Sequence, residues 1–479
     1  MKSLLKPFVI LFFFSVNLYS QTQLTLEDAL SIALKESYGI KSAQYSLLSS
    51  QKTLEAAKLG LMTSINMEFD LPRYSQTLSS QFNPVTGTEQ FFEIGYTTYE
   101  SRLFFSQPIV FTNGTFSLVG SMWRRDQFNE QQDIPVDYYS NLSLRLSQPL
   151  FTFNNLSANL TRAEINLEKS KRNYTRAEYD VIYNVTAGFY QLYQSKMEVE
   201  IAKEKVSQTE TSYQTAMNKF KAGLIAEVEA LQLEIDLASS KNDLLNKERT
   251  FKESKDDFKL LIGLQLSEDI DVSAVLEYLP INVDMEEAVA HALENRSEIK
   301  NSEADIELRN LNVDEVDSRG NISGQLTANY GINKNDDKFN NIFRDFSKDR
   351  GVVFTLSVPV LDWGRNNREV ESTQADLDLT KLTYNNQKQQ IEKEIISILN
   401  KIESAKARVE VLSKSVELAE KSYNISKSRF DAGTITSFDL SQMQLRLTDA
   451  RTNSLYALID YKLAVADLTR KTLFDFEKQ

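Results

Sequence analysis

The sequence predicts a mainly helical protein with a membrane β-barrel portion, built as two tandem repeats that each run from helix to strands to helix. Three observations predict this fold: internal matches at a constant offset, long heptad patterns, and segments in which apolar and polar residues alternate. Only 15 glycines and 8 prolines occur in 479 residues, which favours long uninterrupted helices. Glycine and proline are therefore expected to mark the ends of elements.

Internal similarity defines the repeats. The matching segments are residues 148–151 with 358–361, 219–226 with 429–436, and 26–30 with 285–289. The first two pairs are offset by 210 residues and the third by 259, so the first repeat holds 49 additional residues before Pro149. We assign residues 21–276 to the first repeat, with a helical hairpin turning at Gly223. Residues 277–479 form the second repeat, which turns at Gly433.

Most of the additional residues come from a local duplication. Residues 102–109 resemble residues 144–150 shifted by 41, which indicates one extra strand pair. The sequence Thr112-Asn113-Gly114 lies between the flanking strand patterns, and Asn-Gly is a strong signal for a tight hairpin. The pattern leaves two placements open: the pair either enters the barrel, raising the count per chain from four to six strands, or forms an extracellular or collar-like hairpin.

Residues 1–20 have the layout of a secretory signal peptide, with Lys2 and Lys6 before an apolar stretch at 8–16 and small or polar residues before Gln21. No later stretch approaches the roughly 20 apolar residues that a membrane-spanning helix needs. Cysteine is absent, so neither a disulfide framework, a thiolate metal site nor an acylated cysteine is expected.

Heptad patterns predict two pairs of long helices. From Ile391 to Tyr423 the apolar positions step by 4 and 3 in alternation, Phe430 follows seven residues later, and the pattern resumes after Gly433 from Leu440 to Leu468. In the first repeat a similar pattern begins at Val181 and continues beyond Gly223. A helix over about residues 157–221 would extend roughly 100 Å, too long for a compact globule.

Alternation with a period of two predicts the strands. It is found around residues 65–71, 116–122, 142–146, 322–330 and 352–358, in segments of the length of a membrane-spanning strand. Nearby Trp123, Tyr138, Tyr139 and Trp363 are candidates for interfacial aromatic girdles. A soluble antiparallel sheet would show the same alternation. Six or fewer strands per chain cannot close a wide barrel, so a spanning barrel requires several chains.

Composition argues against other classes of protein. The net charge is −13 with scattered basic residues, so no nucleic-acid-binding face is expected. The single histidine, His291, lies among apolar residues on a predicted helix and is interpreted as structural. One imidazole is too few for a histidine metal site, and neither a catalytic set nor a phosphate-binding glycine loop is present. We therefore expect no enzymatic activity, no metal and no cofactor.

Taken together, these residues resemble the TolC family of outer-membrane efflux proteins over about residues 24–472. The most specific pieces are the strand-to-helix joints at 148–151 and 359–364 and the turns at 220–224 and 430–434. The resemblance implies a homotrimer in the bacterial outer membrane, with one shared β-barrel in the lipid and a long α-helical tunnel in the periplasm. It implies a passive exit duct of a tripartite efflux or type I secretion system, with a periplasmic adaptor and an inner-membrane transporter as partners.

The resemblance also implies roles for individual residues. Adaptor-docking tips would be Gly223, Leu224, Gly433 and Thr434, and the periplasmic gate would include Glu227, Glu229, Asp439 and Gln442. Asp439 matches the first gate aspartate and Gln442 stands in place of the second, whereas Ile435 replaces a gate-locking arginine. The alternative interpretation is that Glu227, Glu229 and Asp439 are ordinary helix N-terminal acids that complement the helix dipole.

Two other classes of protein remain compatible with parts of the pattern. A structural or adhesive coiled-coil protein of the cell envelope needs only the heptads, and a periplasmic adaptor also contains a helical hairpin. An adaptor, however, needs one hairpin with flanking domains rather than two repeats with membrane-length strands. The substrate and the class of transporter are not encoded in these patterns.

Overall fold

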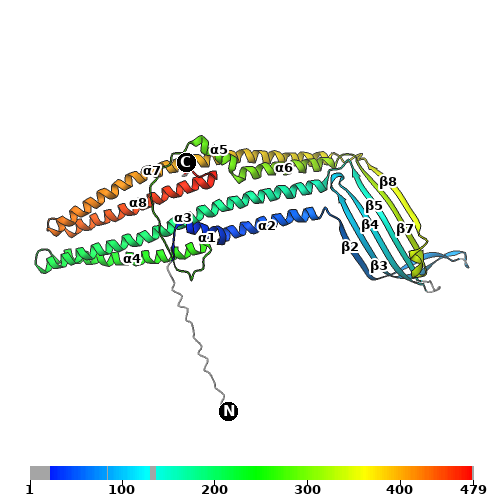
Figure 1. Ribbon diagram of the computed structural model, residues 1–479, viewed down its shortest axis with the longest axis horizontal. Coiled ribbons are helices and arrows are strands. Elements are labelled where there is room, and N and C mark those ends of the chain that lie inside the picture. Colours follow the sequence, from blue (N-terminus) through cyan, green and yellow to red (C-terminus); the bar gives the residue numbers. More distant parts are fainter. Residues whose placement is uncertain (1–21, 84, 130–135, 477–479) are drawn as a thin grey trace, which may run out of the picture. The chain divides into compact units, whose positions relative to one another are not determined.

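The computed structural model describes residues 22–83, 85–129 and 136–476, so the predicted signal peptide lies outside the described residues. The chain divides into two compact units. Unit 1 contains the described part of Met1–Tyr45 with Asn173–Arg296 and Lys388–Gln479, and unit 2 contains Ser46–Arg172 and Ser297–Gln387. Each unit is assembled from segments of both sequence repeats, so the units do not coincide with the repeats. Their elements are labelled in Figure 1.

The helices repeat in length between the two halves of the chain. The matched pairs are α1 (Leu26–Glu36) and α5 (Met285–Asn295) with 11 residues each, α2 (Tyr38–Leu59) and α6 (Ser297–Ser318) with 22, α3 (Asn155–Lys221) and α7 (Arg365–Asp431) with 67, and α4 (Glu227–Ile262) and α8 (Ser437–Thr472) with 36. The predicted plan of two helix, strands and helix repeats is confirmed. The boundary placed between residues 276 and 277 stays a prediction.

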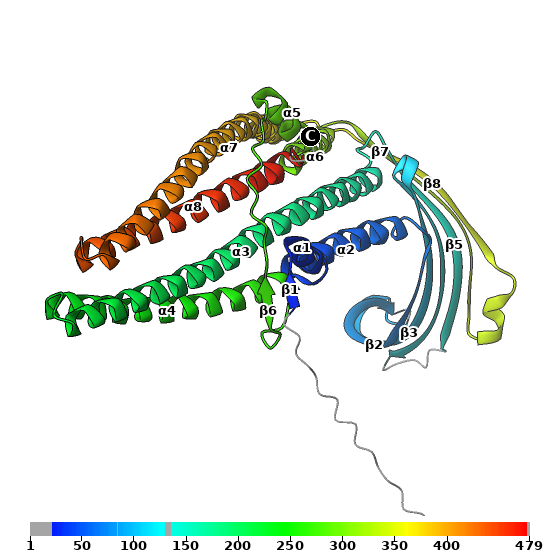
Figure 2. The same cartoon turned by 60° about the vertical axis from the view of Figure 1, so that its left-hand side comes forward.

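Unit 2 contains one six-stranded antiparallel sheet in the order β2-β3-β4-β5-β7-β8. The strands are β2 (Ser64–Asn83), β3 (Thr88–Ile109), β4 (Gly114–Asn129), β5 (Asp137–Leu150), β7 (Ser323–Asp336) and β8 (Ser347–Ser357). They are 11 to 22 residues long. Most of them are longer than the membrane-spanning segments that the alternating pattern predicts. The extra strand pair therefore belongs to the same continuous sheet, which Figure 2 shows curving from β8 to β2.

The predicted hairpin at Asn113 is present, but its loop is longer than a two-residue turn. Ile109 of β3 pairs with Gly114 of β4, so the loop comprises the short helix η1 (Val110–Thr112) and Asn113. Asn113 has φ 58°, a left-handed conformation that asparagine adopts more readily than most residues.

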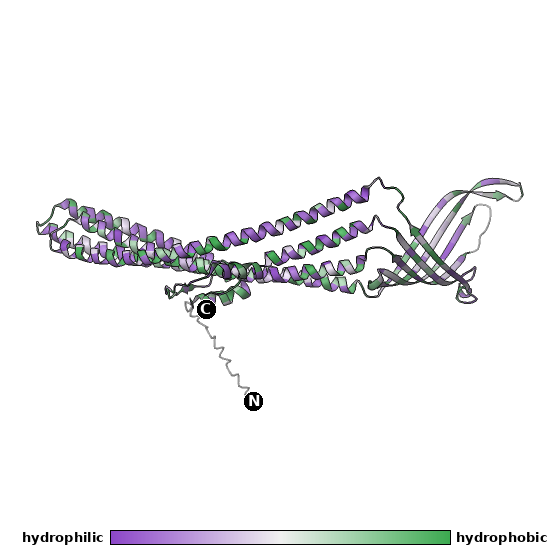
Figure 3. Cartoon of the chain, turned by 90° about the horizontal axis from the view of Figure 1, so that it is seen from above, coloured by the Kyte–Doolittle hydropathy of each residue, from purple (hydrophilic) through white to green (hydrophobic). Residues whose placement is uncertain are grey.

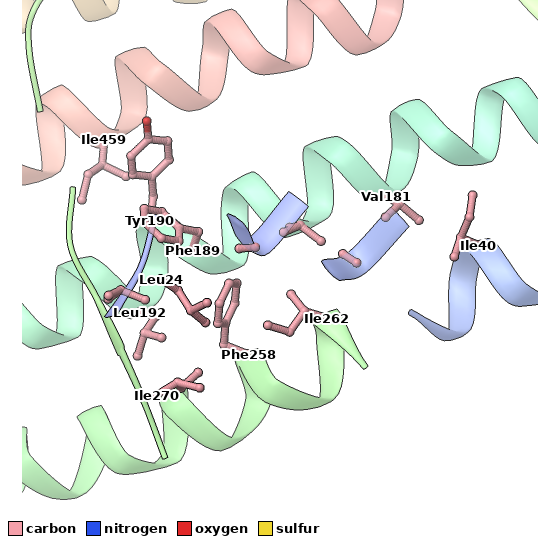
Figure 4. Close-up of a cluster of buried hydrophobic side chains, with 14 residues drawn as sticks. Leu24, Ile40, Val181, Phe189, Tyr190, Leu192, Phe258, Ile262, Ile270 and Ile459 are labelled. Atoms are coloured by element: carbon pink, nitrogen blue, oxygen red, sulfur yellow. The ribbon is translucent and has the colours of Figure 1, made fainter. Parts of the chain in front are cut away.

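Unit 1 has its core where α1, α3, α4 and α8 pack around a small parallel sheet. This sheet joins β1 (Thr22–Leu24) to β6 (Ile270–Val272) and is absent from the sequence-based expectations. Figure 4 shows the core, in which Phe189 and Phe258 meet edge to face with ring centroids 6.1 Å apart. Leu24 and Ile270 of the sheet point into the same cluster.

The heptad positions bury the expected side chains. Buried members include Val185, Phe189, Leu192, Phe258, Ile391, Ile395, Ile402, Phe430, Leu440, Leu447, Tyr461 and Leu468. Figure 3 shows hydrophobic and hydrophilic residues interspersed along these helices, which is the pattern of packed hairpins with one polar side. Between Val409 and Tyr423 the packing loosens, and a groove of about 750 Å³ opens beside Leu412 and Ala419.

His291 stacks on Phe474 with ring centroids 4.1 Å apart and lies 3.8 Å from Glu287. These contacts fit its interpretation as a structural residue. Within the described part of the chain, no group of three or more metal-ligating side chains comes together. Among the described helices, none has both the length and the apolarity to cross a bilayer.

Candidate functional site

Two matching helix reversals form one end of unit 1. Gly223 follows α3 with φ 70° and Gly433 follows α7 with φ 77°. At the first turn the amides of Gly223 and Leu224 donate to the carbonyls of Phe220 and Lys219, at 2.8 and 2.9 Å. The second turn repeats this pair of bonds from Gly433 and Thr434. Both are Schellman motifs, which need a left-handed residue at this position and so favour glycine.

The four predicted tip residues are accessible. A Cβ at Gly223 or Gly433 would meet no atom within 4 Å, so the backbone conformation alone calls for glycine there. Leu224 is 73% exposed, and Thr434 is exposed as well. These turns therefore present an apolar and a polar side chain to their surroundings at equivalent positions.

Behind the turns the two hairpins pack against each other. The shared cluster combines Ala216 of α3, Leu233 of α4, Phe430 of α7 and Leu440 of α8. Ile225 and Ile435, which follow the glycines, pack on this cluster. Ile435 thus adds apolar contact at this place, and its side chain can form no cross-helix salt bridge.

Asp439 caps the helix on which it lies. Its Oδ2 accepts hydrogen bonds from the backbone amide of Thr436 at 3.1 Å and from the Thr436 hydroxyl at 2.8 Å, and the same hydroxyl accepts from the Asp439 amide at 3.2 Å. This is a capping box. The hydrogen bonds from the Thr436 side chain and backbone hold the pKa of Asp439 below its ordinary value. The carboxylate thus remains charged at neutral pH and is exposed to solvent.

The other predicted gate residues have different surroundings. Glu229 occupies the position equivalent to Asp439, but the residue before α4 is Ala226, which has no side-chain oxygen for a cap. Glu227 is exposed in the first turn of α4, while Glu229 and Gln442 are half-buried. All four lie in the first two turns of α4 or α8, at the same end of unit 1. Their gate role stays a prediction, as does the alternative that Glu227, Glu229 and Asp439 are helix N-terminal acids that complement the helix dipole.

Polar contacts that the sequence did not reveal join the two hairpins behind the tips. The Ser441 hydroxyl donates to Asp236 at 2.7 Å, joining α8 to α4. The buried amide of Gln444 donates to the Lys205 carbonyl at 3.1 Å and to Thr209 at 3.0 Å, joining α8 to α3. These partners lie more than 200 residues apart in the chain, so no local pattern could have paired them.

A second polar link lies further along the same helices. The Glu198 carboxylate of α3 accepts from Lys247 of α4 at 2.8 Å and from the Tyr456 hydroxyl of α8 at 2.5 Å. Burial raises the pKa of Glu198, but the hydrogen bonds from Lys247, Tyr456 and Gln194 outweigh it and the net pKa is lowered. Burial, followed by the bond to Glu198, raises the pKa of Tyr456 to about 12.

In unit 2 the strand register sorts side chains onto two faces of the sheet. Across all six strands one face is rich in apolar residues, namely Ile65, Met67, Leu103, Phe105, Phe116, Leu118, Leu142, Leu144, Leu326, Ala328, Val352 and Phe354. The opposite face carries mainly polar residues such as Glu68, Arg102, Ser143, Thr327 and Thr355. We call these the apolar face and the polar face. Only the pairing between strands could show that the apolar positions of neighbouring strands fall on the same face.

The polar face also carries charges and two of the predicted girdle aromatics. Arg102 lies 3.3 Å from Glu68 and Asp70 and 2.9 Å from Glu100. Trp123 and Tyr139 pair across β4 and β5 and stack at 5.3 Å, but the register places both on the polar face. Each of these two lies an odd number of residues from the apolar positions of its strand. The interfacial girdle stays a prediction. Tyr138 does lie on the apolar face.

Comparison with known proteins gives a consistent result. A family model described as outer membrane efflux protein matches residues 115–264 and 288–472. Similar solved structures include the Campylobacter jejuni CmeC outer membrane channel, with a TM-score of 0.71 and 16% identity over 95% of this chain and 88% of that one. The outer membrane protein VceC from Vibrio cholerae has a TM-score of 0.68 and 14% identity over 94% and 96% of the two chains.

A third similar structure is the open state of the Neisseria gonorrhoeae MtrE outer membrane channel, with a TM-score of 0.67 and 16% identity over 93% of this chain and 88% of that one. At such identities the solved structures support the fold, while the family model supports the relationship. Among curated proteins, none matches the sequence of this chain.

Proposed function

The chain belongs to the outer membrane efflux protein family, and from this premise we propose that three copies together form one passive exit duct from the periplasm to the exterior. The family places the protein in the bacterial outer membrane with its helices in the periplasm. What each copy contributes to the duct can be argued from the sheet of unit 2 and the hairpin ends of unit 1.

The observation that carries the proposal is the sorting of the sheet into an apolar and a polar face. In lipid, exposed side chains of a barrel are apolar, and the lumen of a wide barrel is polar. The six strands of one chain would place Leu103, Leu118 and Leu144 toward lipid, with Arg102 and Ser143 toward the lumen. Three copies supply eighteen strands, a number that leaves a water-filled channel in porins.

The edges of the sheet favour closure between copies. Within the described residues, β2 pairs only with β3 and β8 only with β7. Every pairing is antiparallel and the number of strands is even, so β2 and β8 run in opposite directions. A β8 edge can therefore pair antiparallel with the β2 edge of the next copy. Such pairing satisfies the backbone groups that cannot remain free in lipid.

Unit 1 supplies the proposed periplasmic entrance. Threefold symmetry would bring three copies of Asp439 and of Glu229 around one axis, giving a ring of negative charge that attracts cations. The exposed turns at Gly223 and Gly433 would receive a periplasmic adaptor, which connects the duct to an inner-membrane transporter. The transporter would provide energy and substrate choice, because a passive duct supplies neither.

Cross-linking tests the shared barrel directly, because the natural chain has no cysteine. Met67→Cys on β2 is combined in turn with Val352→Cys, Phe354→Cys or Leu356→Cys on β8, and the purified protein is treated with a short bis-maleimide. We expect covalent dimers and trimers with at least one of the pairs. The matched control is Leu118→Cys with Leu144→Cys, which face each other within one chain and should cross-link without an increase in mass.

Reconstitution supplies the functional half of the test. Trimers inserted in planar bilayers should conduct ions, with a conductance that scales with the number of inserted trimers. A chain that stays monomeric in detergent, or a trimer that never conducts, would contradict the exit-duct function. The second result would leave a structural coiled-coil role for the assembly.

A further inference from the structure

The connection between β7 and β8 folds back over the apolar face at the end of the sheet away from the helices of unit 2. It includes the short helix η2 (Phe339–Phe343), in which Ile342 is only 1% exposed. The Ser140 hydroxyl of β5 donates to the Ile342 carbonyl at 2.5 Å. Phe339 meets the ring of Tyr138 edge to face at 5.7 Å. These contacts hold the connection against the sheet.

Between the connection and the sheet lies a pocket of about 320 Å³. Its walls include Met67, Leu103, Met122, Leu142 and Ile332 of the apolar face, with Phe343 and Phe346 of the connection. Ligand pockets begin at about 300 Å³ and are lined mainly by hydrophobic residues. A pocket with these walls on a face that meets hydrocarbon suits an alkyl chain rather than a polar molecule.

Basic side chains adjoin this pocket on the same face of the sheet. Lys348 pairs with the pocket residue Ile332, and Lys334 pairs with Ser140, which also lines the pocket. Arg350 pairs with Tyr330, and its guanidinium lies 5.7 Å from the centre of that ring. Lys348 and Arg350 are exposed.

A fourth cation and two acidic residues of the strands lie on the same face. Arg124 follows Met122 on β4 and is paired with Asp126 at 3.0 Å. Asp336 accepts hydrogen bonds from Asn341 and from the Lys338 amide. Against these two carboxylates stand Arg124, Lys334, Lys348 and Arg350. The connection adds Asp337 and Asp345 together with Lys338 and Arg344, whose charges balance, so the face remains positive where the apolar band ends.

We propose that this place binds a phosphorylated lipid of the outer leaflet, with part of an acyl chain in the pocket and a phosphate between Lys334, Lys348 and Arg350. The inference rests on the proposed function, because it requires the apolar face to meet lipid. Since the helices lie in the periplasm, the opposite end of the sheet faces the outer leaflet. Charge complementarity then selects an anionic headgroup, because cations at a membrane interface attract anionic lipids.

Measurements of bound lipid test the proposed site. Trimers are delipidated in detergent and titrated with diphosphoryl lipid A or with phosphatidylcholine, and bound lipid is counted by native mass spectrometry. Lys348→Gln with Arg350→Gln should weaken lipid A binding about tenfold and leave phosphatidylcholine binding unchanged. Ser101→Leu, which fills the pocket, should weaken the binding of both lipids.

The charge control removes two exposed lysines of unit 1, Lys252→Gln with Lys401→Gln, and should bind lipid A as the natural protein does. The inference is overturned if lipid A binds equally to both charge variants, or if inorganic phosphate alone displaces it. Its failure is distinct from failure of the exit duct, because the variants would then still form conducting trimers. Loss of trimers or of conductance in the natural protein would reject the duct itself.

Discussion

Three glycines of unit 1 have left-handed backbone conformations. Replacing them by alanine tests how much backbone conformation and close packing contribute to the free energy of unfolding. Gly223, Gly263 and Gly433 have φ of 70°, 86° and 77°. An alanine with such a φ costs roughly 1–2 kcal/mol relative to glycine. At Gly223 and Gly433 this is the whole expected cost, because their Cβ positions are open. At Gly263 a Cβ would lie 2.5 Å from the backbone oxygen of Glu36, which adds roughly 1–3 kcal/mol for overpacking.

We therefore expect Gly433→Ala to lower the free energy of unfolding by roughly 1–2 kcal/mol and Gly263→Ala by roughly 2–5 kcal/mol. Denaturant unfolding of the detergent-solubilised protein, followed by far-ultraviolet circular dichroism, measures both. Gly433→Asn is the control and should recover part of the loss, since asparagine tolerates this conformation. Position 473, equivalent to 263, is a leucine with φ 53°, so backbone conformation alone does not exclude a side chain. Equal destabilisation by the two alanine variants would refute the reasoning.

Three further predictions concern charge and packing. Asp439→Ala with Glu229→Ala should reduce cation preference and alter conductance in planar bilayers. The control Asp28→Ala, which removes a capping box of the same kind at α1, should change neither. Unchanged currents and selectivity in the double variant would reject the acidic gate. Because folding lowers the pKa of the Glu198 carboxyl, this group stabilises the fold at pH values above its ordinary pKa of 4.5, and the contribution is lost as the pH falls through the lower pKa of the folded state. Acid unfolding should therefore be less steep in Glu198→Gln, as measured by circular dichroism at decreasing pH. Phe258→Ala should lower the free energy of unfolding by about 3–5 kcal/mol in the same denaturant assay, and a loss below about 1 kcal/mol would show that this core can collapse around the gap.

The helices and turns of this protein follow closely from local sequence. The seam from Ile391 to Phe430 and the glycines at 223 and 433 predict hairpins whose reversals the structure places at those residues. This works because heptad spacing and left-handed glycine are properties of a few neighbouring residues. The strand ends were predicted less well, since β2 and β3 continue through mixed sequence to 20 and 22 residues. There the partner strand, rather than local alternation, determines the length.

The contacts of the candidate sites also differ in whether local sequence could predict them. The capping box of Thr436 and Asp439 lies within four residues and could be read along the chain. The links from Gln444 to Thr209 and from Tyr456 to Glu198 could not, because each joins helices that are distant in sequence. The pocket under the β7–β8 connection likewise needs β2, β3, β4, β5, β7 and Phe343 of the connection in one place, which pairing across the sheet provides.

By itself, the sequence determined the two repeats, the family, the helical hairpins and the existence of two-faced strands, because periodicity and internal offset are carried by the order of residues. Only the tertiary structure decided that the extra strand pair joins the main sheet, that Trp123 and Tyr139 lie on the polar face, and that a small parallel sheet anchors the core of unit 1. The physical reason is register. A shift of one residue between strands exchanges the two faces, and the register depends on the partner strand as well as on the strand itself.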